Sequence, residues 1–343
     1  MFRSILSGWA AAALLSALLL FGAPGTARAD FIWGANGHPL VSYSGISIEA
    51  QLDLLQSLGM RSYRVDTYRP DQLERLRKIV EAGKTRGIEI LPVLIPQVDL
   101  QKQTTDELYA KGYELAHHFI SALKDQVSVW ELGNETEIFS LIRPCEMRDD
   151  GTKYPCQWGI AGGVGVLDYY GPRYVKVLAL LRGLSEGARA ASPTVRRAIG
   201  TAGWGHLGFF ERIQKDGVGW EITVWHLYEG DPEESFKVLA RYGRPIWITE
   251  FNHPLGSQKS EREQAVGLKM AMLRLRQMAK TYNIEAAHIY ELLDEPYWQP
   301  SYEAYMGLVN LRANPPKGWA VDRPKAAYHA VKEVIADKTG ELR

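Results

Sequence analysis

Hydrophobic and polar residues follow one repeated order along most of the chain: a short apolar run, a loop with polar residues or glycine, and then an amphipathic stretch. Short continuous apolar runs are typical of strands buried in a parallel sheet, whereas apolar residues spaced three or four apart are typical of helices. Residues 46–58 have the helical spacing, because Ile48, Leu52 and Leu55 fall on one face and Gly59 ends the pattern.

The repeated order predicts eight strands, and a helix after each of them. The predicted strands are residues 31–35, 61–66, 88–95, 127–130, 197–202, 220–227, 245–250 and 285–292. The predicted helices are residues 46–58, 70–86, 105–124, 169–191, 209–215, 233–242, 261–280 and 325–336. Strands that alternate with helices form a parallel sheet through right-handed crossovers, and eight such units are expected to close into a single (β/α)8 barrel of the α/β class. An open, doubly wound sheet is the alternative, but residues 34–37 lack the third glycine of the dinucleotide-binding motif.

The N-terminal residues 1–29 have the composition of a secretory signal peptide. Arg3 precedes an apolar run at residues 9–21, and the small-residue site Ala27-Arg28-Ala29 follows. An uncleaved membrane anchor is the alternative, but the apolar run is short for a span of about 20 residues. We therefore expect cleavage, no membrane insertion afterwards, and one catalytic barrel over residues 30–343 that is periplasmic or secreted.

The longest predicted irregular segment, residues 136–167, contains both cysteines of the chain, Cys145 and Cys156. In an exported protein two cysteines 11 residues apart favour a local disulfide. A catalytic thiol or a metal ligand has less support, because no histidine stands nearby in the sequence. The glycine-rich residues 159–165 are interpreted as a flexible loop, since no Lys-Ser/Thr pair of a phosphate-binding loop follows them.

The composition limits the class of function. With 46% hydrophobic and 23% charged residues the chain is an ordinary globular protein, and its formal net charge of zero argues against a dedicated nucleic-acid-binding protein. No spacing of His, Cys, Asp or Glu indicates a metal site. We expect an enzyme without a cofactor or metal, acting as a monomer on a polysaccharide or oligosaccharide.

Two glutamates stand at the carboxyl ends of predicted core strands, where a (β/α)8 barrel places its active site. Glu135 follows the fourth strand, directly after Asn134, and Glu250 ends the seventh strand. Each could be a solvated loop residue, but together on one rim they can flank a glycosidic bond. One would donate a proton to the leaving oxygen and the other would attack the anomeric carbon, while Asn134 could bind a neighbouring hydroxyl.

Further polar residues are predicted to point into the same rim. His226 and Tyr228 end the sixth strand and are two positions apart, so they face the same way. Tyr228 could hydrogen-bond the nucleophile and His226 could line the sugar site, unless both only pack at a strand end. Arg64 of the second strand could pair with Glu131 or Glu250 and keep a carboxylate ionised, although a purely structural ion pair is equally consistent with the sequence.

Aromatic and histidine side chains are the other candidates for sugar contacts. Aromatic faces pack against carbohydrate rings, and six such residues are expected on the loop side of the barrel. They are Trp33, Tyr68, Trp158, Trp204, Tyr290 and Trp298. His38 and His206 are candidates for the floor of the sugar site, with a solvated loop histidine as the alternative.

Together these motifs resemble the clan A glycoside hydrolases. The likeness rests on Arg64, Asn134-Glu135, His226-Leu-Tyr228 and Thr249-Glu250 in this order, and it covers the chain after the signal segment. The segments Trp130-Glu131-Leu-Gly-Asn-Glu, Tyr305-Met-Gly-Leu-Val-Asn and Arg323-Pro-Lys-Ala-Ala-Tyr-His-Ala-Val are most similar to family 39. The resemblance implies a retaining mechanism with Glu135 as acid/base and Glu250 as nucleophile. It also suggests the exported barrels that trim bacterial exopolysaccharides.

The chain departs from this resemblance at three points. Gly133 stands where family members often carry Trp before the Asn-Glu pair, and Tyr290-Glu291 stands where a Trp platform often ends strand eight. Trp298 could supply the platform instead. Family 39 enzymes commonly add a β-sandwich, and we expect none after the last helix here. The sequence thus predicts a retaining, endo-acting β-glycosidase for an exopolysaccharide or related β-glycan; a non-catalytic polysaccharide-binding barrel in polymer export and a transglycosylase are the alternatives.

Overall fold

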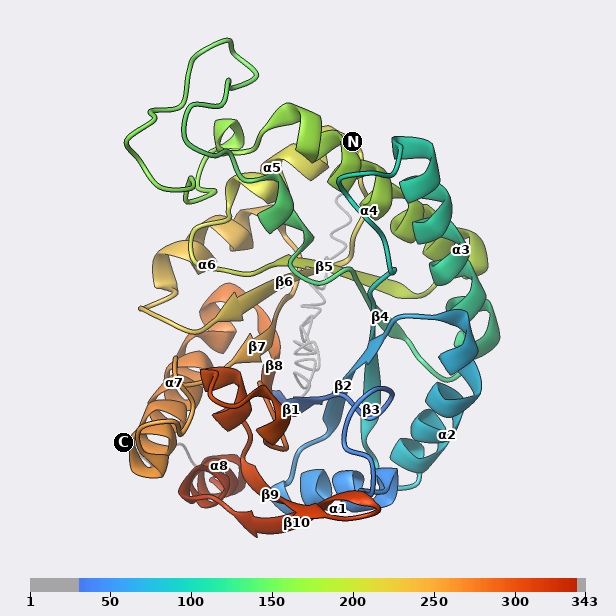
Figure 1. Ribbon diagram of the computed structural model, residues 1–343, viewed down its shortest axis with the longest axis vertical. Helices are drawn as coiled ribbons and strands as arrows, with labels where there is room; N and C mark the ends of the chain where they lie inside the picture. Colours follow the sequence, from blue (N-terminus) through green and yellow to red (C-terminus); the bar gives the residue numbers. More distant parts are fainter. Residues whose placement is uncertain (1–30, 338–343) are drawn as a thin grey trace, which may run out of the picture. The chain divides into compact units, whose positions relative to one another are not determined.

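The computed structural model describes residues 31–337, so the predicted signal segment and its cleavage site lie outside the described residues. Eight parallel strands hydrogen-bond in sequence order, and β8 pairs with β1 to close a barrel (Figure 1). The strands are β1 Ile32–Gly37, β2 Ser62–Thr67, β3 Glu89–Leu94, β4 Val129–Leu132, β5 Arg196–Thr201, β6 Ile222–Leu227, β7 Ile246–Phe251 and β8 Ile284–Ile289. The predicted (β/α)8 fold is confirmed.

Helices surround the strands on the outside of the barrel (Figure 1). They are α1 Ile48–Leu58, α2 Leu73–Lys84, α3 Thr105–Leu123, α4 Gly171–Ala191, α5 Gly208–Lys215, α6 Glu233–Leu239, α7 Glu261–Tyr282 and α8 Ala326–Ala336. Local sequence explains their ends: the Ser47 side chain accepts from the backbone of Ala50 at the start of α1, and Gly59 ends α1 in the left-handed conformation. None of the helices between residues 31 and 337 combines the length and hydropathy that a membrane span requires.

The apolar core has two parts, and together they leave the carboxyl end of the barrel interior for polar residues. A large apolar cluster lies between the strands and the helices. A smaller cluster fills the interior of the barrel at its amino end and contains Leu91, Val129, Val224, Trp247 and Ala286. Because strand side chains alternate between faces, the next inward positions lie closer to the carboxyl ends, and on β4, β6, β7 and β8 they are the polar residues Glu131, His226, Thr249 and His288.

The segment before α8 has structure that the sequence did not indicate. The predicted strand at residues 285–292 and the predicted helix at residues 325–336 leave only a long loop between them, but the chain forms there the antiparallel hairpin β9 Val309–Asn314 and β10 Gly318–Pro324. Its residues are mostly half-buried or exposed, so they lack the continuous apolar run by which the barrel strands were identified. Two predicted helices are also shorter, because residues 70–72 and 240–242 form 3-10 turns instead.

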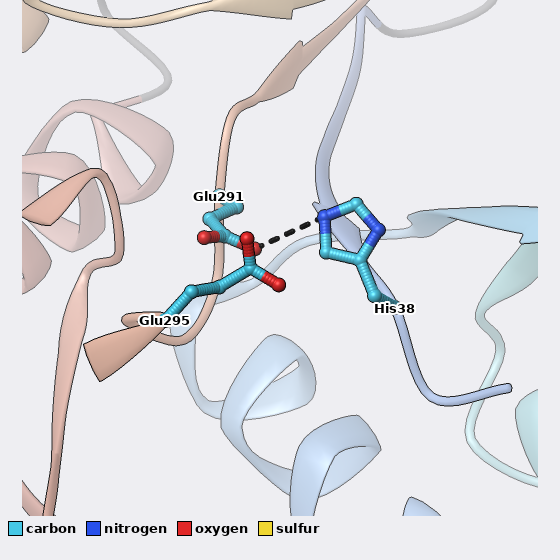
Figure 2. Close-up of side chains that lie close together, drawn as sticks. All are labelled: His38, Glu291 and Glu295. Atoms are coloured by element: carbon cyan, nitrogen blue, oxygen red, sulfur yellow. Dashed lines mark ion pairs between the residues drawn. The ribbon is translucent and has the colours of Figure 1, made fainter. Parts of the chain in front are cut away.

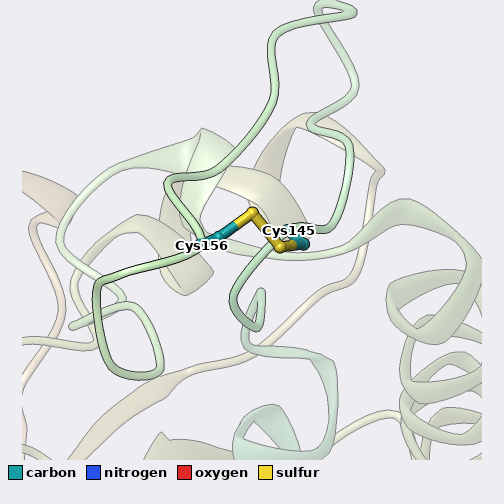
Figure 3. Close-up of a disulfide and its surroundings, with 2 residues drawn as sticks. All are labelled: Cys145 and Cys156. Carbon is teal, nitrogen blue, oxygen red and sulfur yellow. A yellow bond between two sulfur atoms is a disulfide. The ribbon is translucent and has the colours of Figure 1, made fainter.

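The segment between β4 and α4 is irregular, as predicted, and contains the disulfide Cys145–Cys156 (Figure 3). The predicted pairing is therefore confirmed. Ion pairs also tie this segment to the helices, from Glu146 to Arg173 of α4 and from Asp149 to Arg212 of α5. The segment consequently has fixed neighbours on the barrel, although it has little regular structure of its own.

Candidate active site

Glu135 and Glu250 lie opposite one another at the carboxyl end of the barrel. One carboxylate oxygen of Glu135, one of Glu250 and a ring nitrogen of His226 all lie within 4.8 Å of one another. Retaining glycosidases hold their two carboxyl groups about 5–5.5 Å apart, whereas inverting enzymes leave about 6.5–9.5 Å for a water molecule. The short separation matches the retaining arrangement.

Local backbone irregularities bring both glutamates to the rim. Gly133 and Glu135 have positive φ angles of 80° and 48°, so the chain turns sharply after β4 and presents Glu135 at the rim. In β7 the pairing with β6 shifts by one residue: Ile248 pairs with Trp225, but Glu250 pairs with His226. This bulge is a known way of re-aiming a side chain, and it brings Glu250 level with His226.

Arg64 anchors the base of the site from β2. Its guanidinium donates twice to Glu131, at 2.8 and 2.7 Å, and once to Glu250 Oε1 at 2.7 Å. Its remaining two hydrogen bonds go to Asn36 Oδ1 at 2.8 Å and Asn134 Oδ1 at 2.7 Å. All five N–H groups of an arginine are thereby satisfied, so Arg64 fixes the nucleophile candidate and Asn134 in one rigid network.

His226 lies buried between the two candidate catalytic carboxylates. Its Nδ1 is 2.8 Å from Glu135 Oε1 and 3.4 Å from Glu250 Oε2, and its Nε2 is 3.2 Å from Thr249 Oγ1. Burial opposes a charge on His226, but Glu250 and Glu135 outweigh it and raise the pKa of the imidazole. Burial likewise opposes ionisation of Glu135, yet the hydrogen bond and charge of His226 lower the pKa of this carboxyl. The two shifts have opposite directions, as expected for a histidine and a carboxyl group that share a hydrogen bond.

Tyr228 contacts the other side of Glu250. Its hydroxyl donates to Glu250 Oε2 at 2.7 Å, while Arg64 occupies Oε1. Burial and the negative charge of Glu250 raise the pKa of Tyr228 well above its ordinary value, so the phenol stays neutral and remains a donor. Both oxygens of Glu250 thus accept hydrogen bonds, which fix the orientation of this carboxylate.

A cavity of about 760 Å³ opens over this network, and carboxylates dominate its polar lining. Besides Glu135 and Glu250 it is lined by Asp66, Glu229, Glu295 and Glu303. The predicted site residues Arg64, Asn134, Tyr228, His38, Trp204, Tyr290 and Trp298 also line it. The structure thus brings together almost all of the predicted site residues around one cavity.

His38 forms a buried acidic cluster with three carboxyl groups at one wall of this cavity (Figure 2). Its Nδ1 is 2.9 Å from Asp66 Oδ2, its Nε2 is 3.3 Å from Glu291 Oε2, and Glu295 lies beside them. Burial, with the nearby charge of Glu295, raises the pKa of Glu291 to about 8. The alternative of a solvated loop histidine is wrong for His38, because Asp66 and Glu291 enclose it.

Some predicted residues lie elsewhere. The side chain of Trp33 lies on the outer face of β1, in the apolar layer between strands and helices, against Phe31 and Phe251. Trp158 is exposed and packs on Tyr154 of the irregular segment, away from the cavity lining. His226 contacts Glu135 and Glu250 but is not among the residues that line the cavity. His206 is buried, so it is not a solvated histidine either.

The structure adds residues that the sequence did not single out. Asn36, the penultimate residue of β1, joins Arg64 to the backbone carbonyls of Thr249 and Ile289. Glu137 is fully buried two residues after Glu135 and accepts from His206 Nδ1 and the backbone of Ala202. Asn36 could have been found by its place at a strand end. Glu137 gives no such signal, because its partners come from the loop after β5.

Two groups of described side chains have the ligand types of a metal site: His38 with Glu291 and Glu295, and His226 with the two candidate catalytic glutamates. In each group the histidine also holds a carboxylate, and Arg64 supplies a further positive charge beside Glu250. These contacts within the protein are sufficient to explain why the side chains of each group lie close together.

Comparison with known proteins connects this geometry to a class of fold. No model of a protein family matches the chain, and no curated protein matches it. Among solved structures, the β-glycosidase BGL167 matches with a TM-score of 0.60 and 14% identity over 89% of this chain and 96% of that chain. A family 1 β-glucosidase from Thermotoga maritima matches with 0.59 and 13% over 89% and 97%, and virulence factor SghA from Agrobacterium tumefaciens with 0.61 and 12% over the same shares. The chain therefore has the barrel fold that these proteins share.

Proposed function

We propose that the protein is a retaining β-glycosidase of the clan A type, with Glu135 as acid/base and Glu250 as nucleophile. The observation that carries the proposal is the short separation of these two carboxylates, together with the different surroundings of each. Glu250 accepts hydrogen bonds from Arg64 and Tyr228, which hold it in a fixed orientation, whereas Glu135 is bonded to His226, a partner that can exchange a proton with it. The folds of the two β-glucosidase-type neighbours support the same class.

The reaction would proceed by double displacement. A Glu250 oxygen attacks the anomeric carbon while the bond from this carbon to the leaving oxygen breaks, and Glu135 gives its proton to that oxygen. A glycosyl ester of Glu250 results. Glu135 then removes a proton from a water molecule, whose oxygen attacks the anomeric carbon and releases the sugar with retained configuration.

We further propose that the substrate is a bacterial exopolysaccharide or a related β-glycan, cleaved within the chain by an exported enzyme. Support comes from the family resemblance in the motifs and from two exposed tryptophans at the rim. Trp204 and Trp298 expose 67% and 55% of their surface beside the cavity, as platforms for sugar rings would. Asn134 accepts from Arg64 through its oxygen, so its amide nitrogen can donate to a bound hydroxyl.

The test is to incubate the protein with a panel of β-glycans and aryl β-glycosides and to identify the products and their anomeric configuration by NMR. A 2-deoxy-2-fluoro glycoside of a cleaved sugar should then label Glu250. Glu250→Gln should reduce turnover by roughly 10⁴-fold or more without unfolding, and Glu135→Gln should spare substrates with very good leaving groups. Glu285→Gln, at the other end of the barrel, is the matched control. Inversion of the anomer, or full activity of the Glu250 variant, would overturn the proposal.

A further inference from the structure

A second cavity of about 920 Å³ lies next to the first and shares Asn134, Glu135 and Trp204 with it. It runs between the loop after β3 and the segment after β4. Its walls are largely aliphatic or aromatic, and they include Ile95, Pro96, Val98, Leu100, Ile138 and Phe139. Glu135 is the one carboxylate in this lining, whereas the first cavity has six, so the cleft has an acidic part and an apolar part that meet at Glu135.

Exposed apolar side chains surround the entrance of the second cavity. Ile138, Ile160 and Trp204 expose 41%, 62% and 67% of their surface, and all three line the cavity. Clustered exposed apolar side chains mark binding sites more often than isolated ones do. The polar side chains of the lining are Asn134, Glu135, Thr136, Arg143 and His206 among mainly apolar ones, so a hydroxyl-rich ligand would find fewer hydrogen-bond partners there than in the first cavity.

The proposed mechanism determines what would occupy this cavity. If Glu135 is the proton donor, the leaving oxygen lies at its carboxyl group while the reacting sugar lies over Glu250 in the first cavity. The group that carries the leaving oxygen then continues past Glu135. We propose that the second cavity binds an apolar leaving group, an alkyl or aryl moiety attached to the sugar, and thereby selects glycosides that carry one.

This inference rests on the proposed roles of Glu135 and Glu250, but it does not require a polymeric substrate. An alkyl or aryl leaving group is released from the end of a saccharide, so such glycosides form a substrate class of their own beside the bonds within a β-glycan proposed above. Each buried methylene is expected to contribute about 0.8 kcal/mol, which corresponds to a three- to fourfold gain in affinity. A sugar in the same place would gain less, because its hydroxyls would lose water contacts without replacement.

The experiment uses non-hydrolysable n-alkyl 1-thio-β-glycosides, from methyl to octyl, in three sugar series: glucose, galactose and xylose. Calorimetric affinity for the full-length protein should rise about threefold per methylene in at least one series. Phenyl thioglycosides of the same sugars show whether an aryl group serves as well as an alkyl chain. Ile138→Asp and Ile160→Asp should each weaken octyl binding at least tenfold and leave methyl binding unchanged. Met270→Asp, at an exposed apolar residue of α7, is the matched control.

Three results would overturn the inference: affinity independent of chain length in all three series, an equal loss in the Met270 control, or tighter binding of thio-linked disaccharides than of octyl thioglycosides. The binding measurement involves no turnover, so it stands apart from the test of function. Chain-length dependence without any hydrolysis of the corresponding O-glycosides would contradict the glycosidase proposal and retain the apolar ligand site.

Discussion

The guanidinium of Arg64 donates to Glu250 Oε1 at 2.7 Å while two of its other N–H groups hold Glu131. The buried guanidinium of Arg64 thus fixes the position of Glu250, the candidate nucleophile, relative to Glu131 deeper in the barrel. The charges of Glu131 and Glu250 outweigh burial and raise the pKa of Arg64 well above its ordinary value, so this cation persists at any working pH.

Arg64→Lys should therefore impair both stability and activity. A lysine keeps the charge but cannot supply the planar fork, so Glu131, Asn36 and Asn134 lose partners in a buried site. Breaking a buried charged network of this kind costs about 3–5 kcal/mol. Urea unfolding measures the stability, and the rate on an aryl glycoside measures the activity.

Arg197→Lys supplies the matched comparison. Arg197 is also buried and pairs bidentately with Glu221, but it lies on the outer side of β5 away from the cleft. This variant should lose stability without losing rate per folded molecule. Equal kinetic losses in both variants would show that Arg64 has no particular link to Glu250.

Tyr228→Phe removes one hydrogen bond from Glu250 and little else. A hydrogen bond to a charged group contributes about 1.5–3 kcal/mol, so we expect the formation of the glycosyl enzyme to slow by roughly 10- to 100-fold. Pre-steady-state release of the aryl group measures this step. Tyr169→Phe, which removes a buried hydroxyl bonded to Gly163 far from Glu250, should change stability and leave the rate unaltered.

The Glu291 carboxyl should make stability depend on pH in a defined direction. Its pKa is about 8 in the folded protein against an ordinary value of 4.5, so the folded state holds a proton that the unfolded state releases. The stabilisation is complete below about pH 4.5 and is lost as pH rises through about 8. His38, Tyr43 and Glu295 face this carboxyl, and Glu291→Gln keeps it permanently neutral.

The wild type should therefore lose roughly 3–5 kcal/mol relative to Glu291→Gln between pH 5 and pH 9. Denaturation curves across this range measure the difference, and Glu114→Gln on the exposed face of α3 provides the baseline. A difference that stays constant with pH, or that grows in favour of the wild type, would show that Glu291 ionises normally.

The barrel and the rim glutamates were accessible to sequence reasoning because both leave a periodic or positional trace. Buried strands appear as apolar runs. A carboxylate at the carboxyl end of such a run, as in Glu135 and Glu250, is unfavourable in a packed core and therefore indicates a functional residue. The direction of His226 and Tyr228 followed from the two-residue repeat of a strand.

Other features depend on contacts between distant segments and leave no such trace. The bulge in β7 at Thr249, the burial of His38 by Asp66 and Glu291, and the orientation of Trp33 away from the rim all depend on the register of neighbouring strands. The apolar cavity was missed for the same reason, since its walls come from the loops after β3, β4 and β5. Each of these loops looks unremarkable by itself.

Replacement of Cys145 and Cys156 by serine should destabilise the protein, because the unfolded chain gains conformational entropy when the cross-link is lost. A cross-link that closes a loop of this length is expected to contribute about 3 kcal/mol on the chain-entropy model. The ion pairs of Glu146 with Arg173 and of Asp149 with Arg212 remain, so the segment should keep its place on the barrel. Calorimetry with and without a reducing agent measures the effect: the wild type should lose stability on reduction, and the serine variant should not respond.

Lys325 and Asp294 form a buried ion pair that fixes the wall of the first cavity. Lys325 Nζ donates to Asp294 Oδ1 at 2.6 Å and to Ser257 Oγ at 2.8 Å, and Glu295, a cavity residue, follows Asp294 directly. Burial raises the pKa of Asp294 to about 6 in spite of Lys325, and burial also lowers the pKa of Lys325. The pair is therefore held in place against a substantial desolvation cost.

Lys325→Met should cost about 3–5 kcal/mol at pH 8, because it leaves a buried carboxylate without its partner. Without the lysine the pKa of Asp294 rises further, so Asp294 takes up a proton as the pH falls and the loss should shrink at pH 5. The double variant Asp294→Leu with Lys325→Met should recover much of the stability, since neither charge is then buried alone. Urea unfolding at both pH values provides the measurement. Additive losses in the double variant would mean that the two side chains act independently, and a loss that does not change with pH would mean that Asp294 is not the group left unpaired.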